Sequence, residues 1–163
     1  MDRQEKFHTV RGYALQKQGS HDLTPSMEDY LEMIYRLSRD KKYTRINDLA
    51  VALNVQPPSA TRMVRRLAKA DYLKYERYGA VELTPKGEEM GARLLRRHQT
   101  LEAFFRQLGV TENLLKDTEK IEHSLSEETL RCISLFVEFT RTHPEIIKLF
   151  HQYLQDHKHQ GKT

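Results

Sequence analysis

The 163-residue sequence contains one cysteine, no tryptophan and no long hydrophobic run. The single cysteine, Cys132, excludes a disulfide within the chain, and such scarcity is typical of proteins from reducing compartments. Apolar runs such as Leu135–Val137 are far too short to cross a bilayer. Residues 1–6 lack the apolar core and the cleavage site of a signal peptide. Together these absences predict a globular, cytoplasmic protein without a membrane partner.

Several motifs of enzymes and nucleotide-binding proteins are also missing. The sequence has no internal repeat, no glycine-rich phosphate loop and no nucleophile elbow. These absences agree with a protein that is not an enzyme and that has no small-molecule substrate, an expectation that rests on the motifs described below.

Positive charge is concentrated in the first half of the chain. The formal net charge is +4, and residues 1–85 contain 15 basic and 11 acidic side chains, whereas residues 86–163 contain 12 of each. Residues 57–77 alone contain six basic and two acidic side chains. A basic patch on one segment favours a polyanionic partner, although an ordinary solvated surface remains the alternative until a fold motif accompanies it.

Apolar periodicity predicts a mostly α-helical chain. Residues 1–23 show only a faint helical pattern and are expected to form an N-terminal arm. The first clear helix begins at Thr24-Pro25, an N-cap followed by a proline at the first helical position, and runs to about Asp40. Asp29 and Glu32 lie opposite its apolar face, so periodicity alone predicts that both side chains face water.

Two short helices, residues 43–55 and 57–70, follow and are joined by a tight turn. The second helix is basic, and this pair is typical of a helix-turn-helix. Residues 72–78 and 81–83 alternate like strands and would form a wing beside it. We expect DNA contacts from Ser59, Thr61, Arg62, Arg65, Arg66, Lys69, Lys74 and Arg77. A winged-helix scaffold that binds only proteins is the alternative.

The second half of the chain is predicted to be helical throughout, with helices at residues 84–108, 111–125, 126–140 and from Pro144 onward. His98 falls in an apolar stripe, where a hydrogen-bonded core histidine is more common than a metal ligand. Glu119, Glu122 and His123 share one helical turn. This spacing is compatible with a divalent cation but is equally common on solvated helix faces.

Five motifs occur in one order along the chain. They are Thr24-Pro25-Ser26-Met27-Glu28-Asp29-Tyr30 with Glu32, then Pro58-Ser59-x-Thr61, Leu83-Thr84-x-x-Gly87, Arg97-His98 and Glu119-x-x-Glu122-His123. With them the chain resembles the diphtheria-toxin-repressor family of metalloregulators over about residues 23–140, and most of all its manganese-sensing, MntR-type branch. The resemblance implies a winged helix-turn-helix domain at residues 24–92 and an all-helical metal-binding and dimerisation domain at residues 93–157. A tail at residues 158–163 would follow, with no SH3-like third domain.

The resemblance also implies a metal site. The ligand set of the family falls on Asp29, Glu32, His98, Glu119, Glu122 and His123. The resemblance implies a binuclear site with two Mn2+ ions per subunit, and the charge of four carboxylates and two imidazoles, which two divalent cations would neutralise, is compatible with it. Iron-sensing relatives typically have Met and Cys where this chain has Asp29 and Glu119, and oxygen ligands favour manganese. Fe2+ and other divalent metals remain alternatives.

The predicted function is that of a homodimeric repressor that Mn2+ activates for binding to operators of manganese-uptake genes. The first alternative is an iron-responsive regulator of the same family. A more remote alternative is a carboxylate-bridged metal enzyme. Helical bundles of that kind usually repeat a Glu-x-x-His pair on two helices, whereas Leu95 and Lys120 occupy the positions that would complete such pairs here.

Overall fold

A computed structural model describes residues 23–76 and 79–160, and the predicted N-terminal arm lies outside this range except for Leu23. The chain divides into two units between Leu95 and Arg96, a point within helix α5 (Pro85–Gln107). We refer to the part before this point as unit 1 and to the part after it as unit 2. The described residues are mostly helical with one small sheet, which confirms the predicted fold class.

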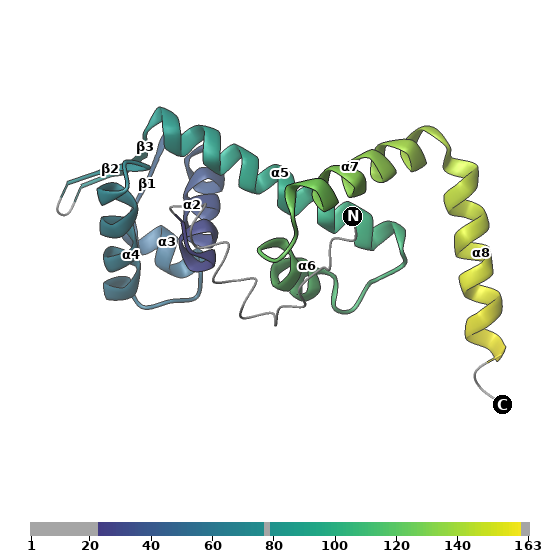
Figure 1. Ribbon diagram of the computed structural model, residues 1–163. Helices are drawn as coiled ribbons and strands as arrows, with labels where there is room; N and C mark the ends of the chain where they lie inside the picture. The colour runs from purple at the N-terminus through teal and green to yellow at the C-terminus, as the bar shows by residue number, and fades with distance from the viewer. Residues whose placement is uncertain (1–22, 77–78, 161–163) are drawn as a thin grey trace, which may run out of the picture. The chain divides into compact units, whose positions relative to one another are not determined.

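Unit 1 combines helices with a three-stranded antiparallel sheet (Figure 1). The sheet order is β1-β3-β2, and β2 and β3 form the wing that follows the helix-turn-helix. Its elements before α5 are α2 (Pro25–Ser38), β1 (Tyr43–Thr44), α3 (Ile46–Ala52), α4 (Pro57–Lys69), β2 (Leu73–Tyr75) and β3 (Val81–Leu83).

The core of unit 1 forms where the apolar faces of its helices meet the sheet. Helix α2 begins as predicted, because Thr24 Oγ1 accepts a hydrogen bond from the Met27 amide at 3.4 Å and Pro25 occupies the first turn. Each helix contributes side chains at helical spacing, so α2, α3 and α4 share one apolar interior. The fully buried residues of this core are Leu31, Ile34, Leu49, Ala60, Val64, Leu67 and Val81.

The turn of the helix-turn-helix depends on Asn54, whose φ of 51° lies in the left-handed region that asparagine tolerates well. The Val55 amide then donates to the Ala50 carbonyl at 2.9 Å, which closes the end of α3. Pro57 follows at the start of α4, where the missing N–H group of proline costs no hydrogen bond within the helix. This short connection sets the basic helix α4 beside α3.

The predicted helix at residues 43–55 is wrong at its start. Tyr43 and Thr44 instead form β1, which pairs with Glu82 and Val81 of β3. Aromatic and β-branched residues suit a strand, and their partners lie almost forty positions away, where helical periodicity has no information about them. Strand β2 is also shorter than predicted and spans Leu73–Tyr75.

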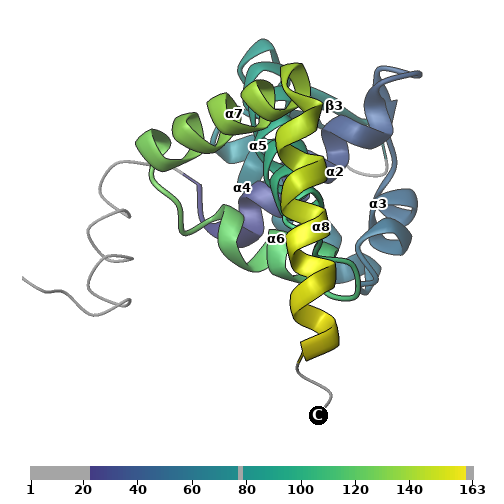
Figure 2. The ribbon, with the colours of Figure 1, turned by 90° about the vertical axis from the view of Figure 1, so that its right-hand side faces the viewer.

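Unit 2 consists of the end of α5 followed by α6 (Leu114–Glu122), α7 (Glu127–Thr142) and α8 (Pro144–Gln160). Gly109, with a φ of 81°, follows the end of α5, and Ser126 caps α7 by accepting from the Thr129 amide at 3.2 Å. Figure 2 shows α8 turning away from the direction of α7. Helix α8 reaches three residues into the segment expected to be a tail.

Gln107, the last residue of α5, ties the helices of unit 2 together. Its side-chain carbonyl accepts a hydrogen bond from Thr140 of α7, and its backbone carbonyl accepts one from His151 Nε2 of α8, each at 2.8 Å. These bonds satisfy a helix-end carbonyl and the buried hydroxyl of Thr140.

Among the described helices, none combines the length and the apolar character that a membrane span requires.

The close packing of Gly87 at the start of α5 leads to a prediction about stability. Alanine normally stabilises a helix by about 1 kcal/mol relative to glycine. At Gly87, however, an added Cβ would lie 2.0 Å from the Tyr72 carbonyl oxygen, and the Gly87 amide is held by Thr84 Oγ1 at 3.0 Å. We expect Gly87→Ala to lower the free energy of unfolding by about 1–3 kcal/mol in urea denaturation.

Glu88→Ala provides the matched control, because Glu88 is exposed on the same turn. It should change the free energy of unfolding by less than about 0.5 kcal/mol. A Gly87→Ala variant as stable as the parent would contradict the close backbone contact.

Candidate functional site

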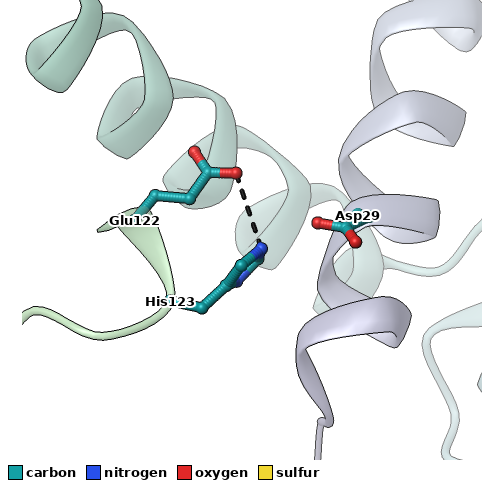
Figure 3. A group of neighbouring side chains, drawn as sticks. All are labelled: Asp29, Glu122 and His123. Atoms are coloured by element: carbon teal, nitrogen blue, oxygen red, sulfur yellow. Dashed lines mark ion pairs between the residues drawn. The ribbon is translucent and has the colours of Figure 1, made fainter. Parts of the chain in front are cut away.

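Three of the predicted metal ligands lie together in unit 2. His98 of α5 and Glu122, the last residue of α6, are both buried, and His98 Nδ1 lies 3.0 Å from Glu122 Oε2. His123, the C-cap of α6, is half-buried, and its Nε2 lies 3.6 Å from Glu122 Oε1. Figure 3 shows this second contact, with the carboxylate of Glu122 directed toward the ring of His123. Glu122 thus has one oxygen near each imidazole.

The burial of Glu122 differs from the solvated helix face that the spacing of its motif equally allowed. Only 3% of it is exposed. A carboxylate removed from water requires compensating partners, and the imidazole of His98 supplies one from a different helix. The hydrogen bond also means that His98 is a hydrogen-bonded core histidine, as its position in an apolar stripe indicates.

Glu119 is placed differently from the other acidic residue of its motif. It lies one turn before Glu122 on α6, and its side chain is exposed. Unit 2 therefore buries one of its two predicted carboxylate ligands and leaves the other in water.

His123 has a second neighbour that the sequence interpretation did not single out. Arg97, which precedes His98 on α5, has its Nη2 3.2 Å from His123 Nδ1. Neither periodicity nor spacing identifies this contact, because the two residues are 26 positions apart and belong to different helices. A guanidinium next to a predicted metal ligand bears directly on the chemistry of that ligand.

The two predicted ligands of unit 1, Asp29 and Glu32, lie one turn apart on α2. Asp29 is exposed, as periodicity predicts. The same prediction is wrong for Glu32, of which only 7% is exposed. Its Oε1 accepts a hydrogen bond from Arg36 Nε at 2.9 Å, an i,i+4 pair along the helix.

The predicted DNA-contact residues form a basic surface on α4 and the wing. Their common feature is at least partial exposure, while the opposite face of α4 enters the core. Arg62, Arg65, Arg66, Lys69 and Lys74 are exposed, and Ser59 and Thr61 are half-buried. Arg77 lies outside the described residues.

Arg62 differs from the other described arginines of this surface because its charge acts on Tyr30 of α2. Its Nη2 donates to Ser59 Oγ at 3.3 Å. Burial raises the pKa of Tyr30 on α2, and the positive charge of Arg62 partly offsets this rise. Arg62 is therefore oriented by Ser59 on its own helix, whereas Thr61 Oγ1 donates to the Pro57 carbonyl at 2.9 Å.

Two family models match consecutive parts of the chain. Residues 22–81 match the N-terminal DNA-binding domain of iron-dependent repressors, and residues 84–150 match their metal-binding and dimerisation domain. A regulator named MntR from Lysinibacillus sphaericus (strain C3-41) is 48% identical over 126 residues, which are 77% of this chain and 91% of that protein. The MntR of Geobacillus kaustophilus (strain HTA426) is 50% identical over 71% of this chain and 83% of its own length.

The chain belongs to the iron-dependent, or diphtheria-toxin, repressor family, in its MntR-type branch. As a member of this family it is a DNA-binding transcriptional regulator rather than an enzyme, with a domain for divalent metal binding and dimerisation. These matches confirm the resemblance inferred from the five motifs.

Solved structures of the same family have the same fold. The manganese regulator SloR aligns with a TM-score of 0.62 at 28% identity, covering 72% of this chain and 55% of that one. A manganese-dependent transcriptional repressor in complex with manganese aligns with a TM-score of 0.62 at 27% identity, covering 69% and 53%. The chain thus spans about half the length of these solved family members.

The basic surface of α4 leads to a prediction for DNA binding by this repressor. If Arg65 neutralises a phosphate, Arg65→Ala should weaken binding to all DNA sequences and should reduce the slope of log K against log salt concentration by about 1. The measurement is fluorescence anisotropy with a labelled duplex at several salt concentrations.

Arg141→Ala removes the same charge from an exposed position of α7 in the other family domain and serves as the control. It should leave the salt slope unchanged. Equal slopes for the parent and for Arg65→Ala would remove Arg65 from the phosphate-contact set.

Proposed function

We propose that this protein is a manganese-activated repressor that binds operator DNA as a homodimer. The observation that carries the proposal is the cluster of His98, Glu122 and His123, a buried carboxylate held between two imidazoles within the metal-binding family domain. Two solved relatives are manganese regulators, which supports the same metal for this chain. As a DNA-binding regulator, it would act in the cytoplasm on operators of manganese-uptake genes.

The proposed ligand set combines residues from both units. Asp29 and Glu32 of α2 would bind metal together with four residues of unit 2: His98, Glu119, Glu122 and His123. Carboxylate oxygens and neutral imidazoles are suitable donors for Mn2+, so the residues fit the ion. Four carboxylates and two imidazoles balance the charge of two divalent cations, and we therefore propose two ions per subunit.

These carboxylates would make the arrangement of the two units dependent on metal. Without a cation, carboxylates brought together repel one another and lose hydration, which opposes their association. Bound divalent cations would offset both the repulsion and the lost hydration. The ligands of α2 would then be joined to those of unit 2, and the α4 helices of the dimer would take the spacing that successive major grooves require. The metal-dependent gain in DNA affinity can be no larger than the difference in metal affinity between the DNA-binding state and the state that does not bind DNA.

The basic surface of α4 would occupy the major groove of the operator. Arginine pairs in two-point contacts with guanine edges or neutralises phosphates, and Ser59 and Thr61 offer hydroxyl groups at the start of the helix. Lys74 on the wing would contact the adjacent backbone. Because Arg62 is oriented by Ser59, we expect it to be among the better-ordered side chains of this surface.

A second candidate is an iron-responsive regulator of the same fold. The family models describe iron-dependent repressors, and one solved relative is the IdeR of T. acidophilum, at 30% identity with a TM-score of 0.58. The carboxylates at Asp29 and Glu119 favour manganese, because oxygen donors suit this hard cation better than they suit softer metals.

The test is a titration of a candidate operator with the full-length protein, followed by fluorescence anisotropy. Mn2+, Fe2+ under anaerobic conditions and Zn2+ are compared with a chelator. We expect Mn2+ to raise DNA affinity by about 10-fold to 100-fold, a common range for coupling between two binding sites. Equal affinity with Mn2+ and with chelator would refute manganese activation, and a response to Fe2+ alone would identify the iron-responsive alternative.

The role of Asp29 in metal choice gives a sharper prediction. Replacing its carboxylate with a thioether in Asp29→Met removes a hard donor, so the preference for Mn2+ over Fe2+ in activating DNA binding should fall by roughly 10-fold. Asp40→Met introduces the same change at an exposed residue just after α2 and should leave the preference unaltered. The selectivity account fails if the Asp29→Met protein responds to each metal as the parent does.

A further inference from the structure

The contact between Arg97 and His123 sets the protonation of a proposed metal ligand. Arg97 Nη2 lies 3.2 Å from His123 Nδ1, and both residues belong to unit 2. A guanidinium has only N–H donors and no acceptor. His123 Nδ1 must therefore accept this hydrogen bond with its lone pair. The ring is then neutral and carries its proton on Nε2, which faces Glu122 Oε1 at 3.6 Å.

This hydrogen bond is incompatible with metal ligation by the same ring. A metal at Nδ1 would need the lone pair that Arg97 uses. A metal at Nε2 would require the proton to move to Nδ1, where it would point at the N–H group of Arg97. Loss of both ring protons is not accessible near neutral pH. Because ligands bind metals through unprotonated nitrogen, either route requires that the contact with Arg97 be broken.

His98 has the opposite arrangement. Its Nδ1 faces Glu122 Oε2 at 3.0 Å, and since a carboxylate only accepts, Nδ1 carries a proton in this contact. A histidine whose one nitrogen donates to a carboxylate is a common form of metal ligand, with the other nitrogen on the ion. The two histidines of the cluster thus differ, because the neighbour of His98 accepts a hydrogen bond whereas the neighbour of His123 donates one.

We propose that Arg97 is an internal competitor for His123, and that metal must displace its guanidinium before this histidine can act as a ligand. The proposal rests on the proposed function, because it takes His123 to be a metal ligand. Arg97 is thus a positioning residue that lowers the affinity of the His123-dependent ion. It would raise the metal concentration at which this ion binds, without changing the donor atoms themselves.

The experiment measures Mn2+ binding to the full-length protein, without DNA, by isothermal titration calorimetry and electron paramagnetic resonance. Arg97→Met keeps an apolar stem of similar length but removes every donor. The His123-dependent ion is identified as the one whose affinity falls in His123→Ala. We expect Arg97→Met to bind this ion roughly threefold to tenfold more tightly than the parent does, since a half-buried charged hydrogen bond is removed. Arg106→Met removes the same charge from an exposed position on α5, where Arg106 pairs with Glu102, and should bind as the parent does.

A double-mutant cycle separates competition for the lone pair from simple charge repulsion. Removing a positive charge alone would tighten Mn2+ binding equally with and without the imidazole. Competition for His123 requires that the gain from Arg97→Met disappear when His123 is already alanine. An equal gain in both backgrounds, an unchanged affinity or a weaker affinity in Arg97→Met overturns the proposal.

A second measurement on the metal-free parent protects the test against misfolded variants. Long-range 15N–1H spectra of the imidazole rings report which nitrogen carries the proton. We expect the Nε2–H form for His123 and the Nδ1–H form for His98, and an Nδ1–H form of His123 would overturn the proposal. If the parent binds no Mn2+ at all, the proposed function fails. If the parent binds Mn2+ through His123 but Arg97→Met gains nothing, only the role of Arg97 fails.

Discussion

The buried carboxylate of Glu122 is the constraint on which the metal-binding domain depends. A carboxylate that is almost fully removed from water is tolerated only with strong hydrogen-bond partners, and His98 is the one that reaches it from α5. The end of α6 is therefore tied to the middle of α5. The same contact determines which nitrogen of His98 carries the proton, so packing and metal chemistry are set together.

Helix α5 runs from the core of unit 1 into this cluster. Leu94 of α5 belongs to the apolar core that also holds α4, and His98 lies one turn later on the same helix. Arg62 is in turn oriented by Ser59, and its charge affects Tyr30 in that core. One side chain of the basic surface thus interacts electrostatically with the core of unit 1, and that core shares α5 with the metal-binding domain.

The sequence predicted well those features that depend on near neighbours. Thr24 is a helix cap as predicted, α5 and α7 begin within one residue of their predicted starts, and the motif order identified the family. Features that depend on distant partners were missed. Strand β1 exists only because it pairs with β3, and the burial of Glu122 depends on a histidine 24 positions away. Periodicity within one helix contains no information about either partner.

The two histidines show why residue identity alone does not define a metal ligand. Both match positions of the family motif, and both lie near the same carboxylate. A neighbour that accepts hydrogen bonds leaves the imidazole with a lone pair on its other nitrogen, whereas a neighbour that only donates uses a lone pair itself. In our proposal Arg97 therefore competes with metal for His123, whereas Glu122 accepts its hydrogen bond from His98. The affinity of such a centre depends on these neighbours as much as on its ligands.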